Sequence, residues 1–139
     1  MNKPPSLWHL YHEGAKFGWE FHISNEDMQN FAKLSGDDNP VHNDLQFAKD
    51  KGFQGPVIYG LLLAGQVSRL IGEELPDQHA MLTFFSSNFL RPALMKEKLR
   101  FDAELVTKSN STHAICLKFK ISSNRSTLCR GTVEAVWRG

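Results

Sequence analysis

The apolar residues of this chain first follow the two-residue period of a β-strand and then the period of a helix. In the segment Phe17–Ile23, large apolar residues alternate with small or polar ones, which predicts a half-buried strand. Ser24 or Asn25 can then cap a helix that Gly36 ends. The apolar residues of this helix share one face, and they are Met28, Phe31 and Ala32.

A second helical pattern begins at Ile58 or Tyr59 and continues to Glu74. It is apolar on nearly every face in its first half, which is typical of a helix buried in a protein core. Gly60 and Gly65 lie where another backbone could approach this helix closely. We therefore predict a buried central helix over this segment.

A short helix is expected between these two. Asp44 can cap it, the chain can stay helical through Asp50, and Gly52 is well placed as its C-terminal glycine. The predicted inner face of this helix consists of Leu45, Phe47 and Ala48.

The remainder of the chain has the composition of β-strands separated by turn residues. The four predicted strands are Met81–Phe89, Leu99–Lys108, His113–Ser122 and Thr127–Trp137. Joined by short turns, they are expected to form an antiparallel meander that is long enough to wrap the central helix. The expected fold is therefore α+β, with a curved antiparallel sheet around one long helix.

Length and charge favour one soluble domain. The 139 residues are enough for a single core, and we expect residues 1–139 to form one domain in which residues 1–15 are an arm that lies on the body or frays. The 16 basic and 15 acidic residues are intermixed, which argues against binding to nucleic acid or to a membrane surface. With two cysteines, no secretory signal and no apolar run long enough to cross a bilayer, the chain is expected to be cytoplasmic.

Candidate chemistry lies in the stretch from Ser35 to His42, which has a carboxylate and an imidazole on either side of an Asn-Pro step. Fully extended, the chain between Asp37 and His42 would span roughly 17 Å. Asn39 can close a turn with its side chain, and Pro40 disfavours the helical region for Asn39, so the chain is predicted to reverse here. The two side chains are therefore expected to face the same small substrate.

The residues around this stretch are similar to a known family, most densely between residues 31 and 72. The matching positions are Phe31, Ser35-Gly36-Asp37, Asn39-Pro40, His42, Asp44, Phe47-Ala48, Phe53, Pro56, Gly60 and Leu62-Leu63-Ala64. They resemble the MaoC-like, single hot-dog (R)-specific enoyl-CoA hydratases. The resemblance implies a hot-dog fold, a homodimer formed by joining two sheets edge to edge, and an active site close to the subunit interface. It also implies an acyl-CoA or acyl carrier protein (acyl-ACP) thioester as substrate, with no further cofactor.

Carried over by position, the resemblance implies roles for individual residues. Asp37 and His42 correspond to the catalytic pair that holds the water, and Gly60 corresponds to the backbone donor to the thioester carbonyl. Asn39 corresponds to a residue that steadies the loop. Two positions of the central helix correspond to the acyl pocket, and they are Ser68 and Ile71.

Three features depart from the family pattern. Tyr59 stands where many members have histidine, and Asp38 stands where an apolar residue is common. Both are expected to alter substrate binding or to tune the catalytic pair. Lys96-Glu97 replaces the Gly-Asp turn that usually follows the Arg-Pro step.

Adding water to an enoyl thioester requires a base for the water, an acid for the α-carbon and a hydrogen-bond donor to the thioester oxygen. Aspartate and histidine suit the first two tasks, and the sequence leaves open which of Asp37 and His42 takes which. The free N–H groups at the start of a buried helix suit the third, and Gly60 lies there. The predicted reaction is (R)-specific hydration of trans-2-enoyl-CoA to (R)-3-hydroxyacyl-CoA, or the reverse dehydration.

Two other functions stay open at this point. A hot-dog thioesterase would hydrolyse the same class of substrate, but many such enzymes have an acidic residue within the long helix, where this chain has Gly65, Gln66 and Ser68. A noncatalytic acyl-thioester binding subunit would need the pocket without the pair, and the pair is present. The remaining histidines show no metal-ligand spacing, so no metal site is expected.

Overall fold

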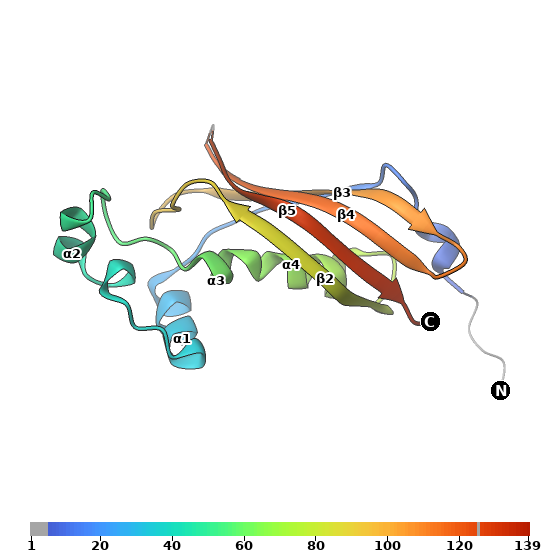
Figure 1. The fold of residues 1–139 in the computed structure, drawn as a ribbon, viewed down its shortest axis with the longest axis horizontal. Coiled ribbons are helices and arrows are strands. Elements are labelled where there is room, and N and C mark those ends of the chain that lie inside the picture. The colour runs from blue at the N-terminus through green and yellow to red at the C-terminus, as the bar shows by residue number, and fades with distance from the viewer. Residues whose placement is uncertain (1–5, 125) are drawn as a thin grey trace.

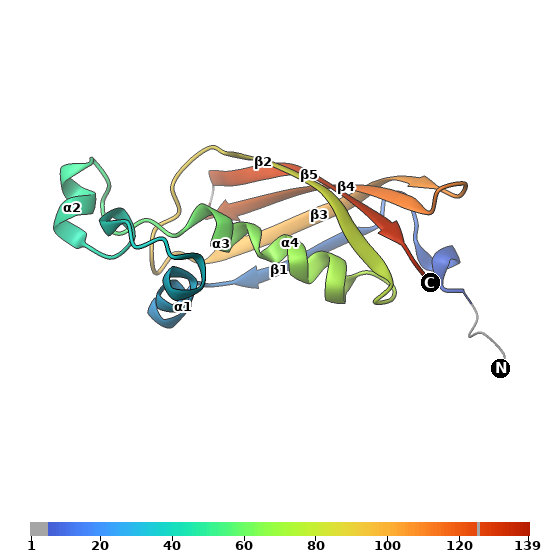
Figure 2. The ribbon, with the colours of Figure 1, turned by 60° about the horizontal axis from the view of Figure 1, so that its bottom comes forward.

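A five-stranded antiparallel sheet curves around one long helical segment, as Figures 1 and 2 show. The computed structural model describes residues 6–124 and 126–139. The strands are β1 (Lys16–Phe21), β2 (Ala80–Phe89), β3 (Leu99–Ser109), β4 (Ala114–Ser123) and β5 (Ser126–Trp137). Each begins and ends within two residues of its predicted bounds. The predicted α+β fold, with a curved sheet wrapped around a central helix, is confirmed.

The order of the strands differs from the predicted meander. β3, β4 and β5 are neighbours, but β1 pairs with β3 and β2 pairs with β5, which gives the order β1-β3-β4-β5-β2. The segment 90–98 therefore leads from one edge of the sheet to the strand next to the other edge. Alternating residues predict a strand but not its partner, and β2 comes directly from a helix that lies across the inner face (Figure 2).

The helices have local sequence causes. They are α1 (Asn25–Ser35), α2 (Leu45–Asp50), α3 (Gly60–Ala64), α4 (Gln66–Arg69), a π-helical turn (Leu70–Glu74) and 3-10 turns at Trp8–Leu10 and Pro40–His42. α1 begins at a capping box formed by Ser24 and Asp27 and ends at Gly36, whose φ is 77°. Asp44 caps α2 as predicted, but Leu45 is exposed and not on its inner face. Among the residues that the structure describes, no helix is long and apolar enough to span a bilayer.

The central helix is confirmed between Gly60 and Glu74. α3, α4 and the π-helical turn follow one another, and Gly65 between the first two is itself helical. Burial is one-sided, because the sheet covers one face of the helix and leaves Leu61 66% exposed. The exposed positions on the uncovered face follow helical spacing, and they are Leu61, Gly65, Ser68 and Gly72. The expectation of burial on nearly every face is therefore wrong.

The core fills the space between the sheet and the central helix. Inner-facing side chains of the sheet are fully buried, among them Leu99, Phe101, Leu105, Leu117, Ile121 and Val133. Trp19 on β1 stacks on Phe101 with ring centroids 4.6 Å apart. Its indole N–H donates to the side chain of Gln66 on α4 (2.7 Å), which ties the first strand to the helix.

The N-terminal arm is packed against the far end of the sheet over the residues that the structure describes, whereas residues 1–5 lie outside that part. Trp8 and Tyr11 are buried. The Lys108 ammonium donates to the carbonyl oxygens of both, at 2.8 Å each. The Asp77 carboxylate accepts from the Tyr11 hydroxyl (2.7 Å) and from the Trp137 indole N–H (2.8 Å). One carboxylate thus joins the arm to the last strand.

Replacing this carboxylate, as in Asp77→Asn, should lower the free energy of unfolding by roughly 1–3 kcal/mol at pH 7, because the oxygen facing the Trp137 N–H becomes a donor. Burial raises the pKa of Asp77, but the hydrogen bonds from Tyr11, Trp137 and the His79 N–H bring it below its ordinary 3.8. A lowered folded-state pKa stabilises the fold above pH 3.8, and this contribution is lost as the pH falls through the folded-state pKa.

The difference between wild type and Asp77→Asn in urea unfolding should therefore shrink below about pH 4. A difference that stays constant down to pH 3 would contradict the role given to this carboxylate.

Candidate active site

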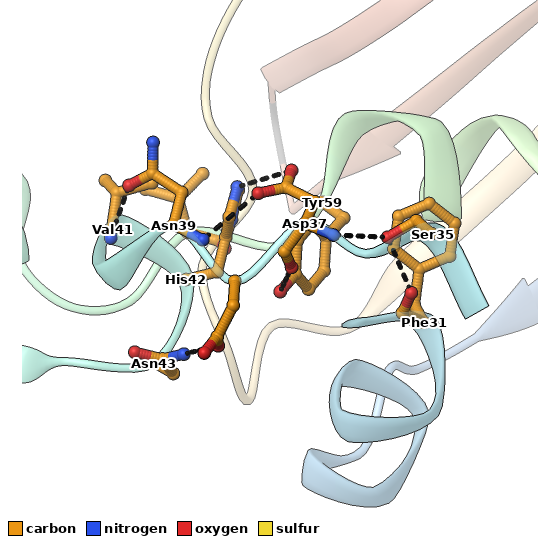
Figure 3. Close-up of polar contacts among 10 residues, drawn as sticks. Phe31, Ser35, Asp37, Asn39, Val41, His42, Asn43 and Tyr59 are labelled. Carbon is orange, nitrogen blue, oxygen red and sulfur yellow. Dashed lines mark hydrogen bonds and ion pairs between the residues drawn. The ribbon is translucent and has the colours of Figure 1, made fainter. Parts of the chain in front are cut away.

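Two consecutive side-chain turns reverse the chain between Asp37 and His42. The Asp37 Oδ1 accepts from the Asn39 N–H (3.1 Å), and the Asn39 Oδ1 accepts from the Val41 N–H (3.0 Å). Pro40 then begins a single 3-10 turn that ends at His42. The predicted turn at Asn39 is present, and the Asp37 Oδ2 lies 3.9 Å from the His42 Nε2 (Figure 3). One water molecule can hydrogen-bond to both atoms at this separation.

The imidazole of His42 is fixed through its other nitrogen. Nδ1 lies 2.7 Å from the carbonyl oxygen of Val57. Because a carbonyl can only accept, Nδ1 carries a proton, and the neutral ring then presents its lone pair at Nε2, toward Asp37. The side chain of His42 is 15% exposed and that of Asp37 is 48% exposed. The pair therefore lies where a substrate can reach it.

Tyr59 holds both members of the pair. Its ring stacks on the His42 imidazole, with centroids 3.9 Å apart and planes 27° apart. Its hydroxyl donates to the backbone carbonyl of Asp37 (2.7 Å), as Figure 3 shows. Burial, followed by the nearby carboxylates of Asp37 and Asp38, raises the pKa of Tyr59. The tyrosine is therefore a neutral donor at physiological pH, and only 3% of it is exposed.

Gly60 is the first residue of α3, and its N–H has no acceptor among the residues of the described ranges. Such helix-start N–H groups carry partial positive charge. Gly60 and His42 line one cavity of about 300 Å³, together with Leu63 and Phe89. A Cβ on Gly60 would lie 2.9 Å from the Phe89 ring. The missing side chain thus leaves room for the Phe89 ring.

The two candidate acyl-pocket residues lie away from this cavity. Ser68 is exposed on α4, and Ile71 is buried in the core. Neither lines the cavity that His42 and Gly60 share. Their part in binding an acyl chain stays a prediction.

The residues that depart from the family pattern adopt specific backbone conformations and hydrogen bonds. Lys96 adopts a φ of 71°, the left-handed conformation that favours glycine. The turn after the Arg-Pro step therefore bends without a glycine, and the Glu97 carboxylate supports it by accepting from the Leu94 N–H (3.2 Å). Asp38 accepts from the Asn43 side chain (2.7 Å).

Sequence reasoning did not single out two residues of the site, Val57 and Phe89. Val57 acts through its backbone carbonyl, which every residue type has, so no sequence signal marks it. The contact of Phe89 with Gly60 depends on where β2 lies in the sheet, which the residue pattern does not predict. Within residues 6–124 and 126–139, no group of three or more metal-ligating side chains is placed to hold a metal ion.

The family model described as "MaoC like domain" matches residues 12–125. The chain belongs to this family. The (R)-specific enoyl-CoA hydratase of Aeromonas caviae is 35% identical over 75 residues, which cover 54% of this chain and 56% of that enzyme. The 3-hydroxybutyryl-CoA dehydratase of Methylorubrum extorquens is 29% identical over 119 residues, which cover 81% of this chain and 76% of that enzyme. The first of these alignments thus spans little more than half of the Aeromonas enzyme.

Solved structures show the same fold. An (R)-hydratase from A. caviae superposes with a TM-score of 0.87 at 24% identity, covering 92% of this chain and 98% of that one. The ChsH1-ChsH2 complex from Mycobacterium tuberculosis gives a TM-score of 0.81 at 18% identity, covering 91% of this chain and 98% of that one. The expected hot-dog fold of this MaoC-like chain is thus confirmed.

The Tyr59→Phe substitution removes the hydroxyl and keeps the ring on His42. It should lower the free energy of unfolding by roughly 0.5–1.5 kcal/mol, the usual net contribution of one hydrogen bond. Tyr59→Leu, which also removes the stacking ring, should cost more. Urea unfolding of the two variants measures both effects. A Tyr59→Phe protein as stable as the wild type would show that the bond to the Asp37 carbonyl does not hold the loop.

Proposed function

We propose that this protein is a hydro-lyase that adds water reversibly to trans-2-enoyl thioesters and forms (R)-3-hydroxyacyl thioesters. The observation that carries the proposal is the Asp37–His42 pair, whose Oδ2 and Nε2 lie 3.9 Å apart, beside the unpaired N–H of Gly60. Membership of the MaoC-like family and the names of the relatives support this reaction. The substrate is an acyl-CoA or acyl-ACP thioester, and the residues act without a further cofactor.

The hydrogen bond from the His42 Nδ1 to the Val57 carbonyl supports His42, and not Asp37, as the base. With Nδ1 protonated, neutral His42 has only a lone pair at Nε2, so it acts as the base in the hydration direction. A water held between Nε2 and the Asp37 Oδ2 gives one proton to Nε2 while its oxygen bonds to the β-carbon. The imidazolium then gives this proton to the α-carbon. One water has been added across the double bond, and both side chains regain their starting states.

Negative charge develops on the thioester oxygen between these two proton transfers. The Gly60 N–H is the donor that stabilises it, and losing one such donor costs about 3 kcal/mol in well-studied enzymes. Asn39 and Tyr59 act through the pair and not on the substrate. Asn39 closes the turn that leads from Asp37 to His42. Tyr59 holds the Asp37 backbone with its hydroxyl and stacks its ring on His42.

Purified protein should therefore hydrate crotonyl-CoA, and the absorbance of the conjugated enoyl group should fall. His42→Gln should lower kcat/KM by roughly 10²- to 10⁴-fold, the usual contribution of a general acid or base. Asp37→Asn should also lower kcat/KM, because the water would lose the carboxylate that holds it beside Nε2. Two matched controls, Asp50→Asn and His12→Ala, change an aspartate and a histidine outside the site and should leave the rate unchanged. Full activity in both site variants would show that the pair is wrongly assigned.

A thioesterase is the competing outcome of the same assay. It would release free thiol from crotonyl-CoA and leave no 3-hydroxybutyryl-CoA, which would overturn the proposed hydration. Chiral analysis of the product tests the stereochemistry, since formation of the (S) product would contradict the (R)-specific reaction. Location in the cytoplasm, expected from the sequence, stays a prediction.

We also propose that the protein is a homodimer joined at β2. This strand is an edge of the sheet, and edge strands present unpaired backbone groups. Large apolar side chains on and next to it are exposed, and they are Met81, Leu82, Phe84, Phe89 and Leu90. Leu61 on the uncovered face of α3 is exposed as well. A second copy would cover these side chains and would lie next to the cavity at Gly60, to which Phe89 contributes.

Light scattering should give a mass of about twice the 15.8 kDa chain. The double variant Leu82→Lys/Phe84→Lys places charges on the proposed interface and should give the monomer mass. Met28→Leu, a change within the core, is the matched control and should stay dimeric. A monomeric wild type would contradict the proposal, and a partner that must be added to obtain a dimer would indicate a heteromeric assembly.

A further inference from the structure

The outer face of the sheet carries a groove that is separate from the candidate active site. α3 and α4 lie on the inner face, and no helix of the described segments covers the outer face (Figure 1). The groove has a volume of about 750 Å³ and crosses all five strands. It ends on β2 at Asn88, which is next to Phe89 in the chain, but successive residues of a strand point to opposite faces. A ligand in the groove would therefore not occupy the cavity at Gly60.

Three cations are concentrated where β4 meets β5. Lys120 lies directly opposite Arg130 in the register of these strands, and Lys118 lies two residues from Lys120 on the same face. All three line the groove and are exposed. None of them has a carboxylate partner within 4.0 Å in the part of the chain that the structure describes. Like charges placed directly opposite each other destabilise a sheet.

The carboxylates of the groove lie on β3, and in the part of the chain that the structure describes none of them lies within 4.0 Å of the charged groups of these three cations. Asp102 is opposite Lys120, but its Oδ1 is 3.1 Å from the Arg100 Nε, with which it forms an ion pair. Glu104 lies between Lys16 and Lys118 in the register. On the other side of the cations, toward β2, the lining side chains are neutral hydrogen-bonding groups, and they are Thr132, Ser86 and Asn88.

We propose that this part of the groove binds the phosphate groups of a small molecule that carries a diphosphate. A guanidinium can bind phosphate oxygens in a bidentate manner, and ammonium groups bind them as point charges. The neighbouring hydroxyl and amide groups can donate to the remaining oxygens. Bound phosphate would offset the repulsion between Lys120 and Arg130. This explains why the sheet keeps two like charges in register at an uncovered position.

Thermal unfolding of the full chain in inorganic pyrophosphate tests the proposal, with sodium chloride at equal ionic strength as the reference. At ten times its Kd, pyrophosphate should raise Tm by about 4 °C over the reference. The double variant Lys120→Gln/Arg130→Gln should lose this shift, and its Tm without anion should equal or exceed that of the wild type. Arg138→Gln removes a cation elsewhere on the surface and should keep the shift.

Equal shifts in pyrophosphate and chloride, or a full shift in the double variant, would overturn the proposal. ADP and adenosine show whether the phosphate groups or the nucleoside of a ligand provides the affinity. ADP should act like pyrophosphate and adenosine should have no effect, whereas an equal effect of adenosine would overturn a phosphate site. Crotonyl-CoA hydration should be the same in the double variant and the wild type, so that failure of the hydratase proposal and failure of the groove proposal are distinguishable.

Discussion

The hydrogen bond between the His42 Nδ1 and the Val57 carbonyl is the interaction on which the rest of the site depends. It joins the loop that carries the pair to the segment that leads into α3. That segment is itself fixed, because the Val57 N–H donates to Val41 (3.0 Å) and the Ile58 N–H donates to Ala93 (2.8 Å). A backbone carbonyl held on both sides cannot titrate or turn away, so the fold itself sets the tautomer of the imidazole.

The order of the strands connects this site to the rest of the molecule. Because β2 lies at the edge of the sheet, its last residue, Phe89, reaches the start of the central helix and packs against Gly60. The loop, the helix start and the strand end thus line one small, open cavity. The same edge position leaves the apolar side chains of β2 uncovered, so formation of the site and assembly of the protein would depend on one strand.

The sequence predicted those features that arise from residues close together in the chain. Ser24, Gly36 and Asp44 marked helix ends because caps act within three or four residues, and Asn39 marked the turn for the same reason. The partner of β2, the one-sided exposure of Leu61 and the acceptor at the Val57 carbonyl could not be predicted, since each depends on segments brought together only by the whole fold. The two in-register cations of the groove belong to this second class.

The state of the His42 ring tests the account most directly. Nitrogen-15 NMR of the histidine side chains, with the His42 signals assigned from the His42→Gln protein, reports which ring nitrogen carries the proton in the neutral form. The account predicts a proton on Nδ1 and a free lone pair on Nε2. A proton on Nε2 in the neutral ring would contradict it, because His42 could then neither donate to the Val57 carbonyl nor take a proton from the water beside Asp37.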